Sequence, residues 1–201
     1  MIFETAIALT GFAFVMSISP GPANLLLLIS GANFGYKKTL PMVLGISAGF
    51  LMMVFFVGIG LGQFIVKHPF VYLALRISCF TYVLWLSFQI AKSRSLGSTE
   101  SNQMSEPFTF LQAALFQLIN PKAWAVALIL TVSYTSSSNF MASLMALIVI
   151  FAIVNIPSIS VWALFGAVLR ESLAKGHRIA IFNISMALLL VCSMVPILLN
   201  A

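Results

Sequence analysis

The segment Ser19-Pro20-Gly21-Pro22 interrupts an apolar run that extends from Phe3 to about Ile29. Each proline lacks a backbone N–H and its ring pushes against the carbonyl one turn earlier, so the carbonyls of Met16 and Ile18 lose their helical partners. If the run crosses a membrane, such a break is tolerated only where it is buried in protein or lines a wet cavity. We therefore predict a broken helix beside a functional cavity, with a simple packing kink as the alternative. The polar residues that flank the break are Ser17, Ser19 and Asn24.

The composition places this run in a membrane. Of the 201 residues, 61% are hydrophobic and only 7% are charged, and the mean hydropathy is +1.10. A soluble domain carries about a quarter of its residues as Asp, Glu, Lys or Arg. The apolar runs are continuous rather than alternating, which favours membrane helices over a membrane barrel. The net charge of +6 lies in short loops, so we expect contact with lipid and no nucleic-acid partner.

Six apolar stretches are long enough to cross the membrane. We expect one transmembrane domain over residues 1–201, with residues 1–91 as a first three-helix repeat, residues 92–107 as a cytoplasmic linker and residues 108–201 as a second repeat. Residues 31–38 are interpreted as a short loop, and three glycines at residues 58–62 are expected to loosen the end of the second span. The six stretches are about Phe3–Ile29, Leu40–Leu61, Phe70–Ala91, Phe108–Tyr134, Phe140–Leu169 and Ile179–Asn200.

Lysine and arginine are distributed unevenly among the five loops. The second and fourth loops hold Lys67 alone, whereas the other three hold seven basic residues. By the positive-inside rule, the odd-numbered loops face the cytoplasm and both termini lie on the opposite, periplasmic side. The seven residues are Lys37, Lys38, Lys92, Arg94, Arg170, Lys175 and Arg178.

With three spans on each side of the linker, the second half enters the membrane from the side opposite to the first. Its opening span is also interrupted, at Asn120-Pro121-Lys122. Paired interruptions in corresponding spans of inverted halves indicate a transporter site near the membrane midplane. Helix N-termini there favour a carboxylate, and exposed carbonyls can receive an ammonium group. The sequence therefore predicts two proline-broken helices, the first and the fourth, facing each other around a site for a zwitterion.

Polar residues within the spans are the other candidates for the site. Lys122 lies well inside its span, where a cation costs several kcal/mol unless it meets water, a partner or a substrate; a role in binding or coupling and snorkelling toward the cytoplasm stay open. Asn155, near Pro157, supplies hydrogen bonds or marks a kink, with the structural role favoured. Gly45 and Gly49 form a GxxxG pair that permits close helix approach. The chain has no Asp and four Glu, all at span ends or in loops, so no buried carboxylate relay for protons is expected.

The motifs Ser19-Pro20-Gly21-Pro22-Ala23-Asn24 and Asn120-Pro121-Lys122-Ala123, with Gly31, Gly35, Gly45 and Gly49 between them, are similar to those of a known family. The chain resembles the lysine exporter and homoserine/threonine resistance family (LysE/RhtB) of bacterial amino-acid exporters over nearly its whole length. The resemblance implies an inner-membrane protein that expels amino acids or close derivatives with the proton gradient, without catalysis and without a cofactor.

The same resemblance implies the site residues. Pro20, Gly21, Pro22 and Asn24, with Ser19, would form one side of the path, and Asn120-Pro121-Lys122 the other. Many members have an acidic residue where Asn24 stands, so this chain departs from the family pattern at a residue that bears on cation recognition and proton coupling. The uncharged cavity is most similar to that of exporters of cysteine, O-acetylserine, homoserine or threonine. Whether the chain forms a homodimer stays open.

Three other functions are compatible with a helical membrane protein. A thiol–disulfide electron carrier would need its cysteines beside the breaks, whereas Cys79 and Cys192 lie in the third and sixth stretches. A metal-efflux protein would need clustered ligands, and His68 and His177 are placed on opposite sides of the membrane, so no metal site is expected. A structural subunit would have no need of polar helix breaks at matching depths in both halves.

Overall fold

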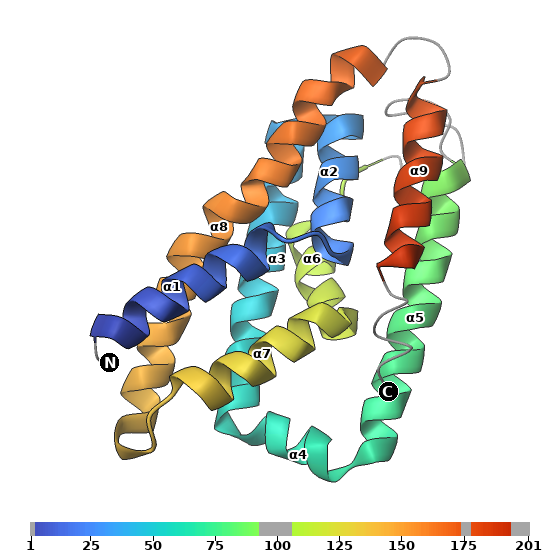
Figure 1. Ribbon diagram of the computed structural model, residues 1–201. Helices are drawn as coiled ribbons and strands as arrows, with labels where there is room; N and C mark the ends of the chain where they lie inside the picture. Colours follow the sequence, from blue (N-terminus) through green and yellow to red (C-terminus); the bar gives the residue numbers. More distant parts are fainter. Residues whose placement is uncertain (1–2, 93–105, 174–177, 194–201) are drawn as a thin grey trace.

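The computed structural model describes residues 3–92, 106–173 and 178–193, and every regular element in these ranges is a helix. The expected all-α class is therefore confirmed for the described residues. Figure 1 shows α5 and α9 side by side at one edge of the bundle, with the remaining helices crossing one another beside them. Large apolar side chains such as those of Phe3, Phe70 and Val132 are exposed on outer helix faces, as expected of surfaces that contact lipid.

The first predicted break separates α1 (Phe3–Ile18) from α2 (Pro22–Phe34), and the two helices are bent by 55°. Gly21 is extended and caps α2 without a side-chain hydrogen bond. Pro22 occupies the first helical position, where the missing N–H has no intrahelical partner to lose. All 13 residues of α2 are buried, so this half-helix is enclosed by protein rather than by lipid.

The loop predicted over residues 31–38 is wrong in extent. Helix α2 continues through the first half of this segment, and α3 (Tyr36–Phe56) begins after Gly35 alone. Gly35 has φ of 82°, a conformation that glycine adopts without steric cost. Asn33, which the sequence places in a turn, stays helical because its Nδ2 donates a hydrogen bond of 2.8 Å to the carbonyl of Ile29.

The end of the second span is kinked at its glycines, as predicted. Helix α3 passes into one turn of π-helix, η1 (Val57–Leu61), in which Gly60 has φ of 134°. The short α4 (Gly62–Lys67) follows, and the chain then turns back into α5 (Pro69–Lys92).

The second predicted break separates a short helical pair, α6 (Phe110–Phe116) and η2 (Gln117–Ile119), from α7 (Pro121–Tyr134). The two parts are bent by 74°. A capping box fixes the start of α6: the Thr109 hydroxyl accepts from the Gln112 N–H, and the Gln112 side chain accepts from the Thr109 N–H. Such reciprocal capping satisfies two N-terminal donors.

The last part of the described chain holds one long helix and one shorter helix. A single 3₁₀ turn, η3 (Ser137–Asn139), leads into α8 (Phe140–Leu173), and α9 (Arg178–Cys192) follows. Pro157 lies inside α8 without ending it.

Helices from different halves pack closely where glycines allow it. Helix α8 contacts α1, α2 and α3, and α3 contacts α6 and α7. On α2, a Cβ at Gly31 would collide with the Ala163 carbonyl, and on α8 a Cβ at Gly166 would collide with the Leu28 carbonyl. These two helices therefore approach backbone to backbone, as small residues permit in membrane proteins.

The GxxxG pair of α3 has the same role, as predicted. A Cβ at Gly45 would collide with the Phe110 carbonyl, and a Cβ at Gly49 with the Ala114 carbonyl. The first broken helix thus rests against α8, and the second against α3.

By length and composition, the described residues contain two to four membrane spans. Two continuous helical stretches qualify, Tyr36–Ile65 and Phe140–Leu173. Each bent pair, α1 with α2 and α6–η2 with α7, qualifies when counted as one span, and α9 is a shorter apolar helix. The protein is therefore a membrane protein with several spans, and most of the predicted linker lies outside the described residues.

Candidate functional site

The two carbonyls that the prolines of the first break strand both have acceptor roles in the structure. Ser19 Oγ donates to the Met16 carbonyl at 3.2 Å, and Trp162 Nε1, from α8, donates to the Ile18 carbonyl at 3.1 Å. An unsatisfied carbonyl in a membrane costs several kcal/mol, so these donors make the break tolerable. Because Trp162 lies 144 residues further along the chain, the break depends on the second half.

Asn24 supplies further donors at the first break. Its Nδ2 donates to the carbonyls of Ser17, at 2.7 Å, and Ser19, at 2.9 Å. Asn24 is buried, so this amide holds the end of α1 against the start of α2. Its short side chain replaces the backbone donors that a continuous helix would have provided.

Lys122 joins the second break to the first. Its Nζ donates to the Ser19 carbonyl at 2.8 Å and to Ser19 Oγ at 2.7 Å. A Cβ at Gly21 would lie 2.8 Å from Lys122 Cδ, so glycine leaves room for the lysine side chain to pass. The ammonium therefore points to the opposite break rather than snorkelling away from it.

The second break has its own set of polar contacts. Asn120 Nδ2 donates to Gln117 Oε1 at 2.9 Å, and Trp124 Nε1 donates to the Leu118 carbonyl at 2.8 Å. The N-terminus of α7, like that of α2, has no side-chain cap. Uncapped N-terminal N–H groups and the helix dipole both attract negative charge.

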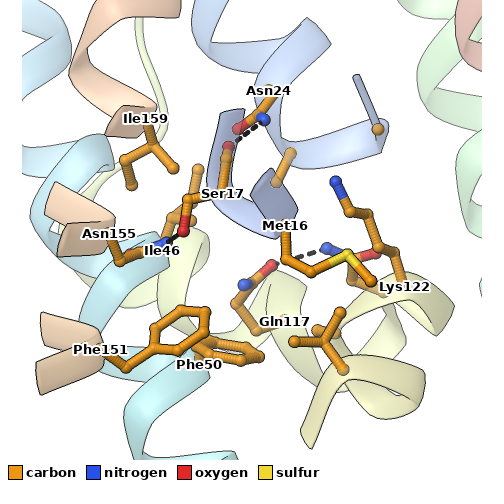
Figure 2. Close-up of a pocket in the computed structure, with 15 residues that line it drawn as sticks. Met16, Ser17, Asn24, Ile46, Phe50, Gln117, Lys122, Phe151, Asn155 and Ile159 are labelled. Carbon is orange, nitrogen blue, oxygen red and sulfur yellow. Dashed lines mark hydrogen bonds between the residues drawn. The ribbon is translucent and has the colours of Figure 1, made fainter. Parts of the chain in front are cut away.

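Helix α8 adds a polar group from a helix that is not broken. Asn155 Nδ2 donates to Ser17 Oγ at 2.9 Å, and the residue is buried. The hydrogen-bond role predicted for this residue is therefore present, whereas the kink at Pro157 does not interrupt the helix. Asn155 and Lys122 lie on opposite sides of the same space in Figure 2.

This space is a cavity of about 50 Å³ between the two breaks. A water molecule needs roughly 10–15 Å³ of such volume, so the cavity has room for a few waters. The lining combines polar side chains with apolar ones. The lining residues are Met16, Ser17, Gly21, Ala23, Asn24, Ile46, Phe50, Gln117, Asn120, Lys122, Ala123, Val126, Phe151, Asn155 and Ile159.

Five of the nine site residues predicted from sequence line the cavity: Gly21, Asn24, Asn120, Lys122 and Asn155. The other four shape it indirectly. Ser19 is the acceptor for Lys122, Pro22 and Pro121 start the half-helices, and Pro20 is exposed at the bend.

Sequence reasoning did not identify several residues of this site. The sequence predicts Ser17 only as a polar neighbour of the first break, and Gln117 and Trp162 are not among the predicted site residues. The aromatic wall of the cavity was also missed: Phe50 and Phe151, from α3 and α8, have ring centroids 4.8 Å apart. No local signal identifies these residues, because in the sequence they are ordinary members of apolar helices.

Of the cysteines and histidines behind the two alternative chemistries, those that the structure describes are not lining residues of the cavity. Cys192 is exposed on α9, and the side chain of Cys79 and residue His177 lie outside the described residues. Among the residues that the structure describes, no group of three or more His, Cys, Asp or Glu could hold a metal ion.

Comparison with known proteins identifies the relatives of the chain. The sequence profile of a family described as LysE type translocator matches residues 14–199. The cysteine/O-acetylserine efflux protein of Escherichia coli is 26% identical over 188 residues, covering 90% of each chain, and that of Shigella flexneri is 27% identical over the same length. An uncharacterized membrane protein of Vibrio cholerae is 26% identical over 113 residues, 55% of each chain. No solved structure gives a significant match.

Proposed function

The chain belongs to the LysE type translocator family, and from this premise we propose that it exports a small neutral amino acid or amino-acid derivative. The resemblance read from its proline motifs is confirmed at the level of the family, and the protein is a membrane transporter rather than an enzyme. Relatives that match over 90% of the chain include cysteine/O-acetylserine efflux proteins. Cysteine and O-acetylserine are therefore the first substrates to test, with homoserine and threonine next.

The contact between Lys122 and Ser19 carries this proposal. It brings an ammonium group and two uncapped helix N-termini to one cavity. The chain has no Asp, and its four Glu residues lie at span ends or in loops, so the substrate carboxylate is the natural counter-ion for Lys122 inside the membrane. A cationic substrate such as lysine would meet this charge without a compensating carboxylate.

We further propose six spans in two inverted repeats, residues 1–91 and 108–201, joined by residues 92–107. The exchanged packing supports this: the first broken helix rests on α8, the second rests on α3, and α5 pairs with α9. A two-fold rotation that exchanges the halves would turn the contact of the first broken helix with α8 into the contact of the second with α3.

The outward route in this proposal follows the seam between α3 and α7. A second cavity of about 320 Å³ lies beyond the end of α3 and along α7, lined in part by Gly58 of η1, Gly62 of α4 and Thr131 of α7. Fully buried apolar side chains, including Val54 and Ala127, lie at the intervening positions. The described conformation is thus closed between the two cavities, and export requires these side chains to separate.

We also propose that the protein lies in the bacterial inner membrane with both termini in the periplasm, and that export is coupled to protons. The bias of Lys and Arg to the odd-numbered loops supports the orientation. Because no carboxylate lies in the interior of a span, protons would be carried by the substrate, by Lys122 or by water in the cavity.

The experiment is transport by purified protein in liposomes with an imposed proton gradient. Cysteine, O-acetylserine, homoserine, threonine and lysine are offered as labelled substrates. We expect transport of at least one neutral amino acid and none of lysine. Preferred transport of lysine, or of none of the five, would contradict the proposal.

A further inference from the structure

The central cavity contains two buried acceptors that the protein leaves without partners. Asn120 Oδ1 and Asn155 Oδ1 have no hydrogen bond within the described residues. The side chains are 3% and 6% exposed, and both residues line the cavity. A buried polar atom without a partner costs about 1–3 kcal/mol, so two of them at one cavity indicate a ligand that donates hydrogen bonds.

The amide nitrogen atoms of both residues already donate hydrogen bonds within the protein. Asn155 Nδ2 donates to Ser17 Oγ, and Asn120 Nδ2 donates to Gln117 Oε1. Each side chain is held in place by one N–H of its amide group, and its oxygen stays available as an acceptor for a ligand. The two oxygens come from different elements, α8 and the residue before α7.

We propose that Asn120 Oδ1 and Asn155 Oδ1 bind the α-ammonium group of the substrate. This inference rests on the proposed function and adds a requirement: the substrate has a free amino group. Its carboxylate faces Lys122, which lies opposite Asn155 (Figure 2). The cavity then recognises both charged ends of a zwitterion, with a cation for one end and neutral amides for the other.

Neutral acceptors suit a transporter of neutral amino acids. A carboxylate at this position would hold the ammonium group strongly and would also accept a second positive charge on the substrate. Amide oxygens give directional hydrogen bonds without a fixed charge, so release stays easy. The aromatic wall of Phe50 and Phe151 leaves an apolar boundary for a short side chain.

O-acetyl-L-serine and N-acetyl-L-serine provide a matched pair of probes. The two isomers have the same atoms and the same carboxylate, but only the first has a free amino group. Competition by each against labelled O-acetyl-L-serine is measured in liposomes at mildly acidic pH, where the acetyl group does not migrate to the amine. Because hydrogen bonds to a charged group contribute about 1.5–3 kcal/mol, we expect the O-acetyl isomer to compete at least about tenfold better.

Two variants assign this discrimination to the amide. Asn155→Leu removes the acceptor, and we expect the ratio between the isomers to fall toward one. Asn155→Asp keeps the shape and adds charge, so we expect the ratio to be retained or increased. Ligand-induced thermal stabilisation in detergent reports binding independently of transport, and it is measured for each variant that folds.

Each outcome has a defined meaning. If the wild-type protein transports a neutral amino acid but both isomers compete equally, the ammonium site is wrong and the proposed function stands. If Asn155→Leu folds and keeps the wild-type ratio, these oxygens hold only water and the inference is overturned. If the wild-type protein transports no amino acid, the proposed function and this inference fail together.

Discussion

At the scale of single residues, the first break leaves backbone carbonyls that accept hydrogen bonds from side chains instead of from the backbone of their own helix. The position of the stranded carbonyls follows from the prolines alone, and the sequence predicts them at Met16 and Ile18. Their donors, Ser19 Oγ and Trp162 Nε1, differ in how far they are predictable. Ser19 is a neighbour, whereas Trp162 belongs to the other half, and a single sequence contains no signal for that pairing.

Lys122 is predicted to be essential for transport. Lys122→Met keeps the length and apolar stem of the side chain but removes the charge and both hydrogen bonds to Ser19. Since hydrogen bonds of charged groups contribute about 1.5–3 kcal/mol, we expect transport to fall by at least about tenfold. Liposome transport is the measurement, with the exposed Lys37→Met as control. Equal transport by both variants would rule out a role for the Lys122 charge.

Trp162 is predicted to stabilise the fold through its indole N–H. Trp162→Phe keeps an aromatic ring but leaves the Ile18 carbonyl without its donor. A lost hydrogen bond of this kind costs about 1 kcal/mol, which corresponds to about 2–4 °C in the thermal midpoint of a chain of this size. The midpoint is measured in detergent, and Trp85→Phe, on an exposed site of α5, is the control. Equal thermal midpoints for the two variants would contradict the stabilising role of the Trp162 indole N–H.

At the scale of elements, the helix breaks follow from proline, but the first connection does not follow from its turn-forming residues. Asn33 stays within helix α2 because its Nδ2 donates hydrogen bonds to the Ile29 carbonyl and, at 3.4 Å, to Asn183 Oδ1 of α9. Tertiary contacts of this kind override local preference. Tertiary contacts also override local preference at Pro157, because packing against α1, α2 and α3 keeps α8 continuous through this proline.

The contact between α2 and α8 is predicted to be intolerant of a single methyl group. Gly166→Ala places a Cβ against the Leu28 carbonyl, and overpacking of this kind typically costs about 1–3 kcal/mol. We expect a lower thermal midpoint in detergent. Gly11→Ala is the matched control, because a Cβ there meets nothing within 4 Å and lies in the exposed α1 face. A Gly166→Ala protein as stable as the control would show that the helices can separate freely.

At the scale of the whole molecule, the orientation in the membrane is open to a direct test with the two ends of α8. Ser138, just before this helix, and Ser172, near its end, are both exposed. The 34 residues of α8 extend about 50 Å at 1.5 Å per residue, enough to put the ends on opposite sides. The proposed topology places Ser138 outside and Ser172 in the cytoplasm.

We predict opposite labelling of two single-cysteine proteins. With Cys79→Ser and Cys192→Ser as background, Ser138→Cys should react with a membrane-impermeant maleimide in intact cells. Ser172→Cys should react only after the cells are permeabilised. The reverse pattern would invert the topology, and labelling of both in intact cells would show that α8 does not cross the membrane.

The exchange of partners between the halves has a consequence for how the protein is made. Ribosomes deliver the N-terminal half first, yet the surface against which α1 and α2 rest is α8, among the last helices to be synthesised. Until then the nascent α1–α2 elbow has carbonyls whose donor has not yet been translated. Insertion therefore cannot finish helix by helix, and the early segments need shelter in the translocon or beside a membrane chaperone until the second half arrives.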